Sequence, residues 1–143
     1  MRYRCVTALA VLGMVGPLGP AAPLGAQAPA RFTTSQARAG EEGYQDVCAS
    51  CHKADLSGNF EAPPLAGSDF LSLWGGRPAR ELFAYVKAAM PPAGRKPDDE
   101  ALTNIVTYIL RRNGMRAGGT PFATTEDGVI APAAPEGAGA APR

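Results

Sequence analysis

Between Thr33 and Gly114 the apolar residues recur at the three- and four-residue spacing of amphipathic helices, and no useful stretch alternates as a strand would. The clearest helix lies between Asp98 and Asn113. Asp98 is a favoured N-cap residue, acidic residues follow it, and two arginines precede the Asn113-Gly114 stop. The apolar positions form one stripe: Leu102, Ile105, Val106, Ile109 and Leu110. We expect this stripe to face a core.

A second helix is predicted from Thr33 or Thr34 to about Cys48. Thr33 and Gln36 have the spacing of a capping box. Apolar and small residues share one side of the helix: Ala37, Gly40, Tyr44 and Val47. A glycine inside a helix costs about 1 kcal/mol relative to alanine. Gly40 therefore predicts that another helix approaches the backbone here, the alternative being an exposed and merely tolerated glycine.

Two shorter helices lie between these. Proline is favoured at the first helical position, so a helix is predicted to start at Pro78. It would turn four residues inward: Leu82, Phe83, Val86 and Met90. Ser68 is a candidate cap for a segment of one or two turns that ends near Trp74. The predicted fold class is all-α.

The first 28 residues have the form of a cleavable secretory signal peptide. Arg2 and Arg4 precede an apolar run that leads to the small-x-small sequence 26–28. A retained membrane anchor is the alternative, but Pro17, Pro20 and Pro23 interrupt the run well before the roughly 20 residues that a spanning helix needs. We expect cleavage after Ala28, a periplasmic location and no membrane span after cleavage.

The remaining chain is predicted to hold one small domain. Residues 29–32 are interpreted as an N-terminal extension, residues 33–117 as the domain, and residues 118–143 as a Gly/Pro/Ala-rich disordered tail. Ala131–Arg143 contains no large apolar side chain that would offset its ordering entropy. Loose packing over the domain remains an alternative for three apolar residues that lie nearer to it: Phe122, Val129 and Ile130.

Composition and charge narrow the class of function. The 143 residues include 17 glycines and 14 prolines, which favours one domain with much loop. A formal net charge of +1 lacks the basic face typical of nucleic-acid binders, so no nucleic-acid partner is expected. Six scattered cations are candidates for docking an acidic partner, although solvated surfaces also carry such charges: Lys53, Arg77, Arg80, Lys87, Arg95 and Lys96.

The sequence Cys48-Ala-Ser-Cys51-His52 is the C-x-x-C-H motif of c-type haem attachment. Two thiols at this spacing can form thioethers with the two vinyl groups of one haem, and the following imidazole can bind its iron. The alternatives are a thioredoxin-like redox pair, a structural disulfide and a zinc site. A thioredoxin-like pair belongs to a βαβ unit, which the pattern lacks. His52 is the single histidine of the chain, which excludes a His-rich zinc site and a bis-histidine haem.

A neutral, soft sixth ligand suits an iron that carries electrons. After signal removal two methionines remain, Met90 and Met115. Met90 ends the helix predicted from Pro78 and precedes Pro91-Pro92, which break the helix and can present the sulfur in a rigid loop. Met115 follows the Asn113-Gly114 stop, and we expect it to pack at the domain edge. The predicted iron ligands are therefore His52 and Met90.

The chain from about Thr33 to Pro121 resembles the class I monohaem cytochromes c, particularly small periplasmic cytochromes c and the cytochrome c domains of quinohaemoprotein alcohol dehydrogenases. The matching residues are Gly40-x-x-x-Tyr44-x-x-x-Cys48-Ala-Ser-Cys51-His52, Pro63-Pro64-Leu65-Ala66-Gly67, Trp74, Met90-Pro91, Ile105-Val106-Thr107-Tyr108-Ile109-Leu110 and Asn113-Gly114. The resemblance implies the cytochrome c fold, in which the N- and C-terminal helices cross over a covalently bound haem. Gly40 and Tyr44 would then lie near Tyr108.

The resemblance also implies roles around the haem. The Pro63 carbonyl would accept the Nδ1 proton of His52. Leu65 would pack on the porphyrin. Trp74 and Arg77 would donate to a haem propionate, unless Trp74 only fills the core and Arg77 is only a solvated charge.

These expectations describe an electron-transfer protein and not an enzyme. It would carry one haem c on Cys48 and Cys51 and would shuttle electrons in a respiratory chain. Its redox protein partners would be a quinoprotein dehydrogenase or quinol-oxidising complex on one side and a terminal oxidase or other acceptor on the other. A haem subunit fixed in a larger oxidoreductase complex remains the first alternative, and an open-coordination haem enzyme or gas sensor the second.

Overall fold

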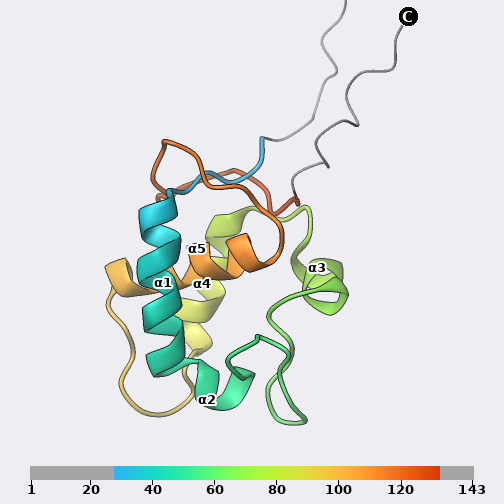
Figure 1. Cartoon of the computed structure of the whole chain (residues 1–143), viewed down its shortest axis with the longest axis vertical. Helices are drawn as coiled ribbons and strands as arrows, with labels where there is room; N and C mark the ends of the chain where they lie inside the picture. The colour runs from blue at the N-terminus through green and yellow to red at the C-terminus, as the bar shows by residue number, and fades with distance from the viewer. Residues whose placement is uncertain (1–27, 133–143) are drawn as a thin grey trace, which may run out of the picture.

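The structure, a computed structural model, describes residues 28–132, and these residues form five helices (Figure 1). The helices are α1 (Thr34–Val47), α2 (Ala49–His52), α3 (Ser68–Trp74), α4 (Ala79–Ala89) and α5 (Asp99–Arg112). Within residues 28–132 the extended backbone pairs only as isolated bridges, without a strand. The predicted all-α fold class is therefore confirmed.

The crossing of α1 and α5 organises the fold (Figure 1). Gly40 lies so close to α5 that an added Cβ would overlap the backbone carbonyl of Asn104. One turn further along, the rings of Tyr44 and Tyr108 pack with their centroids 5.3 Å apart. The predicted close approach at Gly40 and the expected contact with Tyr108 are both confirmed.

The ends of the two long helices follow their capping signals. The Thr33 hydroxyl accepts from the Gln36 amide at 3.2 Å, and the Gln36 side chain accepts from the Thr33 amide at 3.2 Å, which completes the predicted capping box. The Asp98 carboxylate accepts from the Ala101 amide at 2.8 Å. Each bond satisfies an amide that the helix itself leaves unpaired.

The two shorter helices start one residue away from the prediction. Gly67, with φ 89°, occupies the cap position of α3, so Ser68 is the first helical residue and not a cap. Pro78 caps α4, and the helix begins at Ala79. Proline fixes φ but leaves ψ free, and ψ of Pro78 is extended at 133°.

The segments on either side of the predicted domain join its core, which corrects the predicted boundaries (Figure 1). The Ala30 amide donates to the Val129 carbonyl, and the Val129 amide donates to the Ala28 carbonyl, both at 2.9 Å. Four apolar side chains in these segments are buried: Phe32, Phe122, Val129 and Ile130. Residues 118–132 are therefore packed and are not a disordered tail.

The remaining predictions for the ends fall outside the described residues. The predicted signal peptide, except Ala28, and the Ala/Pro-rich stretch 133–143 lie there. Among residues 28–132 no helix is long and apolar enough to cross a membrane.

Candidate functional site

A cavity of about 370 Å³ lies among α2, α3, α4 and the loops between them. Its lining is mainly apolar, and its volume falls within the roughly 300–1,000 Å³ typical of ligand and cofactor sites. All eight predicted site residues line it: Cys48, Cys51, His52, Pro63, Leu65, Trp74, Arg77 and Met90. The fold thus brings together residues that span more than forty positions of the sequence.

The C-x-x-C-H motif occupies the short helix α2 and its N-cap. The Cys48 carbonyl accepts from the amides of Cys51 and His52 at 3.2 and 2.9 Å, so one turn of helix sets the three side chains relative to each other. Both thiols are free; Cys48 is half-buried and Cys51 exposed. Burial, with a contribution from the neighbouring Cys51 thiol, raises the pKa of Cys48 to about 11. Cys48 therefore holds its proton at neutral pH.

His52 is buried and oriented by the loop that follows it. Its Nδ1–H donates to the Pro63 carbonyl at 2.8 Å, as the resemblance implied. The same loop returns to the His52 backbone, where the carbonyl accepts from the Gly58 amide at 3.0 Å. Because Nδ1 carries the proton, Nε2 keeps its lone pair and is the nitrogen able to bind a metal.

Leu65 forms part of the cavity wall and is held there by Asn113, a residue that the sequence analysis treated only as a helix stop. The buried Asn113 amide nitrogen donates to the carbonyls of Leu65 and Ile109 at 2.8 and 2.9 Å, and its oxygen accepts from the Gly67 amide at 3.0 Å. The bonds to Gly67 and Leu65 join positions 46 and 48 residues apart, so no local pattern could have indicated them.

Trp74 and Arg77 stand together on the cavity wall. The Arg77 guanidinium lies over the Trp74 ring, 4.3 Å from its centroid, and forms an ion pair with Glu81 at 2.9 Å. The backbone of this corner is fixed by the chain's C-terminal segment. The Gly76 amide donates to the Ile130 carbonyl, and the Ile130 amide to the Arg77 carbonyl, both at 2.9 Å. This support could not be predicted from local signals, because Ile130 lies in the Gly/Pro/Ala-rich segment predicted to be a tail.

The two candidate methionines lie in different parts of the structure. Met90 caps the C-terminus of α4, where its amide donates to the Val86 carbonyl at 2.8 Å, and it lines the cavity beside Pro91 and Pro92. Met115 is 4% exposed inside the main core, which corrects its expected place at the domain edge.

The residues present fit a c-type haem. The donor set combines two free thiols, one imidazole with an available nitrogen and one thioether, and the cavity walls are apolar. Among residues 28–132 no three His, Cys, Asp or Glu side chains gather as they would around a metal ion alone. Cys48, Cys51, His52 and Met90 are the residues that would hold the haem.

An all-α fold with crossing terminal helices and a C-x-x-C-H motif on an apolar cavity defines a c-type cytochrome domain. The family model described as cytochrome c oxidase, cbb3-type, subunit III matches residues 35–109, and the chain belongs to this family. A cytochrome c domain transfers electrons through its haem and exchanges them with redox partners. No curated protein and no solved structure matches the chain.

Proposed function

We propose that the chain is an exported one-electron carrier with one haem c, attached through Cys48 and Cys51 and bound at iron by His52 and Met90. The observation that supports this most is that all four of these residues line the same apolar cavity. The signal-like residues 1–28 support a periplasmic location, where thioether attachment to an exported chain takes place.

Different residues of the cavity would control the attachment of the haem, the orientation of its ligand and its reduction potential. The haem iron, when bound, supplies the one-electron chemistry. The short helix α2 presents the two thiols at a fixed spacing, and the Pro63 carbonyl fixes the ring plane of His52 and leaves its Nε2 available to the iron. A thioether from Met90 would raise the reduction potential, and the apolar walls would keep water away from the metal.

Trp74 and Arg77 are proposed to donate to a haem propionate. Both line the cavity, and together they supply an indole N–H and a guanidinium with five N–H donors. Arg77 pairs with Glu81 through its Nε and Nη2 atoms, and a guanidinium has further donors for a second carboxylate.

The Met90 assignment is tested by comparing Met90→Leu with the matched control Met115→Leu in the haem-loaded protein. We expect the parent and Met115→Leu to show the ferric thioether-to-iron charge-transfer band, and Met90→Leu to lack it. Reduced Met90→Leu should also bind carbon monoxide, because its sixth position is open. A parent that lacks the band and binds carbon monoxide rapidly and stoichiometrically would instead have an open haem site, as in a sensor or enzyme.

A haem subunit of a larger oxidoreductase complex is the second candidate. The family description names a subunit of a cytochrome c oxidase, which favours it. Gel filtration of a native periplasmic extract and of solubilised membranes distinguishes the two. A free carrier elutes near the mass of the single chain, whereas a fixed subunit elutes with a large assembly.

A further inference from the structure

The turn that directly follows His52 adopts a backbone that its residues disfavour. Lys53 has φ 62° and Leu56 has φ 67°, in the left-handed region where a side chain other than glycine is strained. This turn connects His52 to the loop that contains Pro63, and the Pro63 carbonyl accepts the Nδ1–H of His52. Contacts from outside the turn must therefore compensate for its backbone strain.

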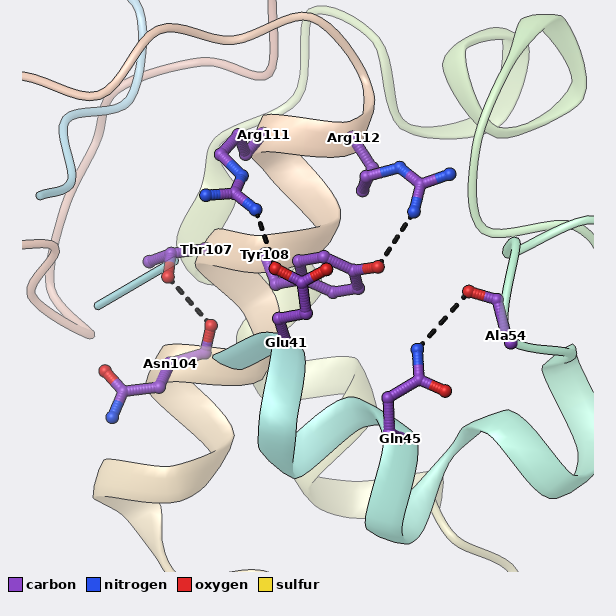
Figure 2. Close-up of polar contacts among 8 residues, drawn as sticks. All are labelled: Glu41, Gln45, Ala54, Asn104, Thr107, Tyr108, Arg111 and Arg112. Atoms are coloured by element: carbon purple, nitrogen blue, oxygen red, sulfur yellow. Dashed lines mark hydrogen bonds and ion pairs between the residues drawn. The ribbon is translucent and has the colours of Figure 1, made fainter. Parts of the chain in front are cut away.

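Three successive carbonyls of this turn each accept a hydrogen bond from a side chain of α1 or α5. Tyr44 donates its hydroxyl to the carbonyl of residue 53 at 2.8 Å. Gln45 Nε2 donates to the carbonyl of residue 54 at 3.4 Å, and Arg112 Nη2 donates to that of residue 55, also at 3.4 Å. Figure 2 shows the contact of Gln45 with Ala54 and Arg112 reaching the Tyr108 hydroxyl from α5.

Tyr44 makes the strongest of the three contacts. Its side chain is fully buried, with 0% exposure, whereas the contacts of Gln45 and Arg112 are exposed and longer. Its ring is held against Tyr108 at the crossing of α1 and α5, so the hydroxyl has little freedom to follow a moving turn. A hydrogen bond from a buried, fixed donor constrains its acceptor more than one from a flexible exposed side chain.

We propose that Tyr44 is a positioning residue for His52. Its hydroxyl pins the carbonyl of Lys53, the next residue along the chain, and so holds the imidazole at the angle that the Pro63 carbonyl accepts. The helix crossing and the geometry of the iron ligand are thereby coupled through one hydroxyl. This inference rests on the proposed function, in which His52 binds the haem iron.

Tyr44→Phe tests the inference, and Tyr108→Phe is its matched control. Both variants remove one hydroxyl from the same ring pair, but the Tyr108 hydroxyl accepts from Arg112 and does not contact the turn directly. The readout is hydrogen exchange, by NMR of the reduced haem protein, at His52 Nδ1–H and at the Gly58 amide. We expect exchange at both sites to rise about five- to tenfold in Tyr44→Phe, the effect of losing one hydrogen bond, and less than about twofold in Tyr108→Phe.

The Val106 amide inside α5 serves as the reference for global opening. If Tyr44 acts only through overall stability, exchange at Val106 rises as much as at His52, and the inference is overturned. Equal acceleration in the two variants overturns it as well. Should Tyr44→Phe fail to accumulate, Gln45→Ala weakens the same turn from its exposed side, and it must accelerate Gly58 more than Val106.

The absorption spectrum of the parent protein separates this inference from the proposed function. A parent without attached haem contradicts the proposed function. A parent with haem whose Tyr44→Phe variant exchanges like the control contradicts only the role of Tyr44.

Discussion

The cavity residues depend on individual hydrogen bonds that connect distant parts of the chain. His52 is oriented by Pro63, and the wall containing Leu65 is tied to the end of α5 by Asn113. In both bonds the acceptor is a backbone carbonyl, so the side chain opposite it must supply the polar donor. A single substitution at such a position therefore leaves a polar group buried without a partner.

Asn113→Ala is expected to destabilise the protein by about 3 kcal/mol. It removes a buried hydrogen bond to the Ile109 carbonyl and part-buried bonds to the Leu65 carbonyl and the Gly67 amide, and loss of the partner of a buried polar group costs about 1–3 kcal/mol. Asn104→Ala is the control, because the contact of Asn104 in Figure 2 is made by its backbone carbonyl with Thr107. Urea unfolding measures both variants. A loss below about 0.5 kcal/mol for Asn113→Ala would contradict the assigned role.

Tyr44 makes the free energy of unfolding depend on pH in the alkaline range. Burial, with smaller contributions from Cys48 and Tyr108, holds the pKa of Tyr44 well above its usual value of about 10. A raised pKa in the folded state means that the stabilisation is fully present below pH 10. It is lost as pH rises further, because the unfolded chain ionises first.

The parent protein should therefore lose its stability advantage over Tyr44→Phe above pH 10, by at most about 1.4 kcal/mol per pH unit. Urea unfolding of both proteins at pH 8, 10 and 11 checks this expectation. A difference that stays constant between pH 8 and 11 would show that the Tyr44 hydroxyl titrates normally.

At the scale of elements, the contact between α1 and α5 requires two backbones to approach closely. A Cβ at Gly40 would overlap the carbonyl of Asn104 and lie near the Ile105 amide, and neither backbone atom can move without shifting α5. A Cβ at Gly43 would instead meet the Ile105 side chain, at 3.2 Å from Cγ1 and 3.4 Å from Cδ1, and this side chain can rotate or shift slightly. The same helix thus offers one intolerant and one tolerant glycine.

Gly40→Ala should lower the free energy of unfolding by about 2–3 kcal/mol, as overpacking of a close contact does. Gly43→Ala should change it by less than about 1 kcal/mol, because the gain in helix propensity offsets the tighter contact. Thermal unfolding of the haem-loaded proteins measures both. Equal melting temperatures for the two variants would contradict the backbone contact at Gly40.

The C-terminal segment 118–132 acts as a structural element although it contains no helix. Ending the chain after Ala117 removes the buried side chains of Phe122 and Ile130, each worth about 1.5–3 kcal/mol, and the hydrogen bonds to Gly76 and Arg77. We expect this truncation to lower the melting temperature. It should also change the absorption spectrum of the haem, because the corner that contains Trp74 and Arg77 loses its backbone support. Ending the chain after Pro132 is the control and should change neither property.

At the scale of the whole molecule, the sequence predicted what depends on local signals and missed what depends on distant ones. The periodicity and caps of α1 and α5 are local signals, and the predicted bounds of these two helices hold to within a residue or two. The bonds of Asn113 and the packing of Ile130 join segments more than forty residues apart. Such contacts depend on the assembled fold and leave no periodic pattern.

The surface charge of the whole molecule sets how strongly it attracts an acidic partner. Three of the six predicted docking cations pair with acidic side chains of the same chain: Arg77 with Glu81, Arg80 with Asp127 and Lys87 with Asp99. Pairing of this kind weakens the field that would steer an acidic partner. Electron transfer to a partner should therefore depend only modestly on salt. Measuring the second-order rate at low and high ionic strength checks this, and a steep fall with salt would contradict it.

The central claim is that one haem is joined to Cys48 and Cys51. Trypsin cuts after Arg38 and Lys53, so mass spectrometry of the exported protein yields one peptide that contains the whole C-x-x-C-H motif. We predict that this peptide carries the added mass of a single haem. An unmodified peptide, with its two thiols free or joined as a disulfide, would contradict the account.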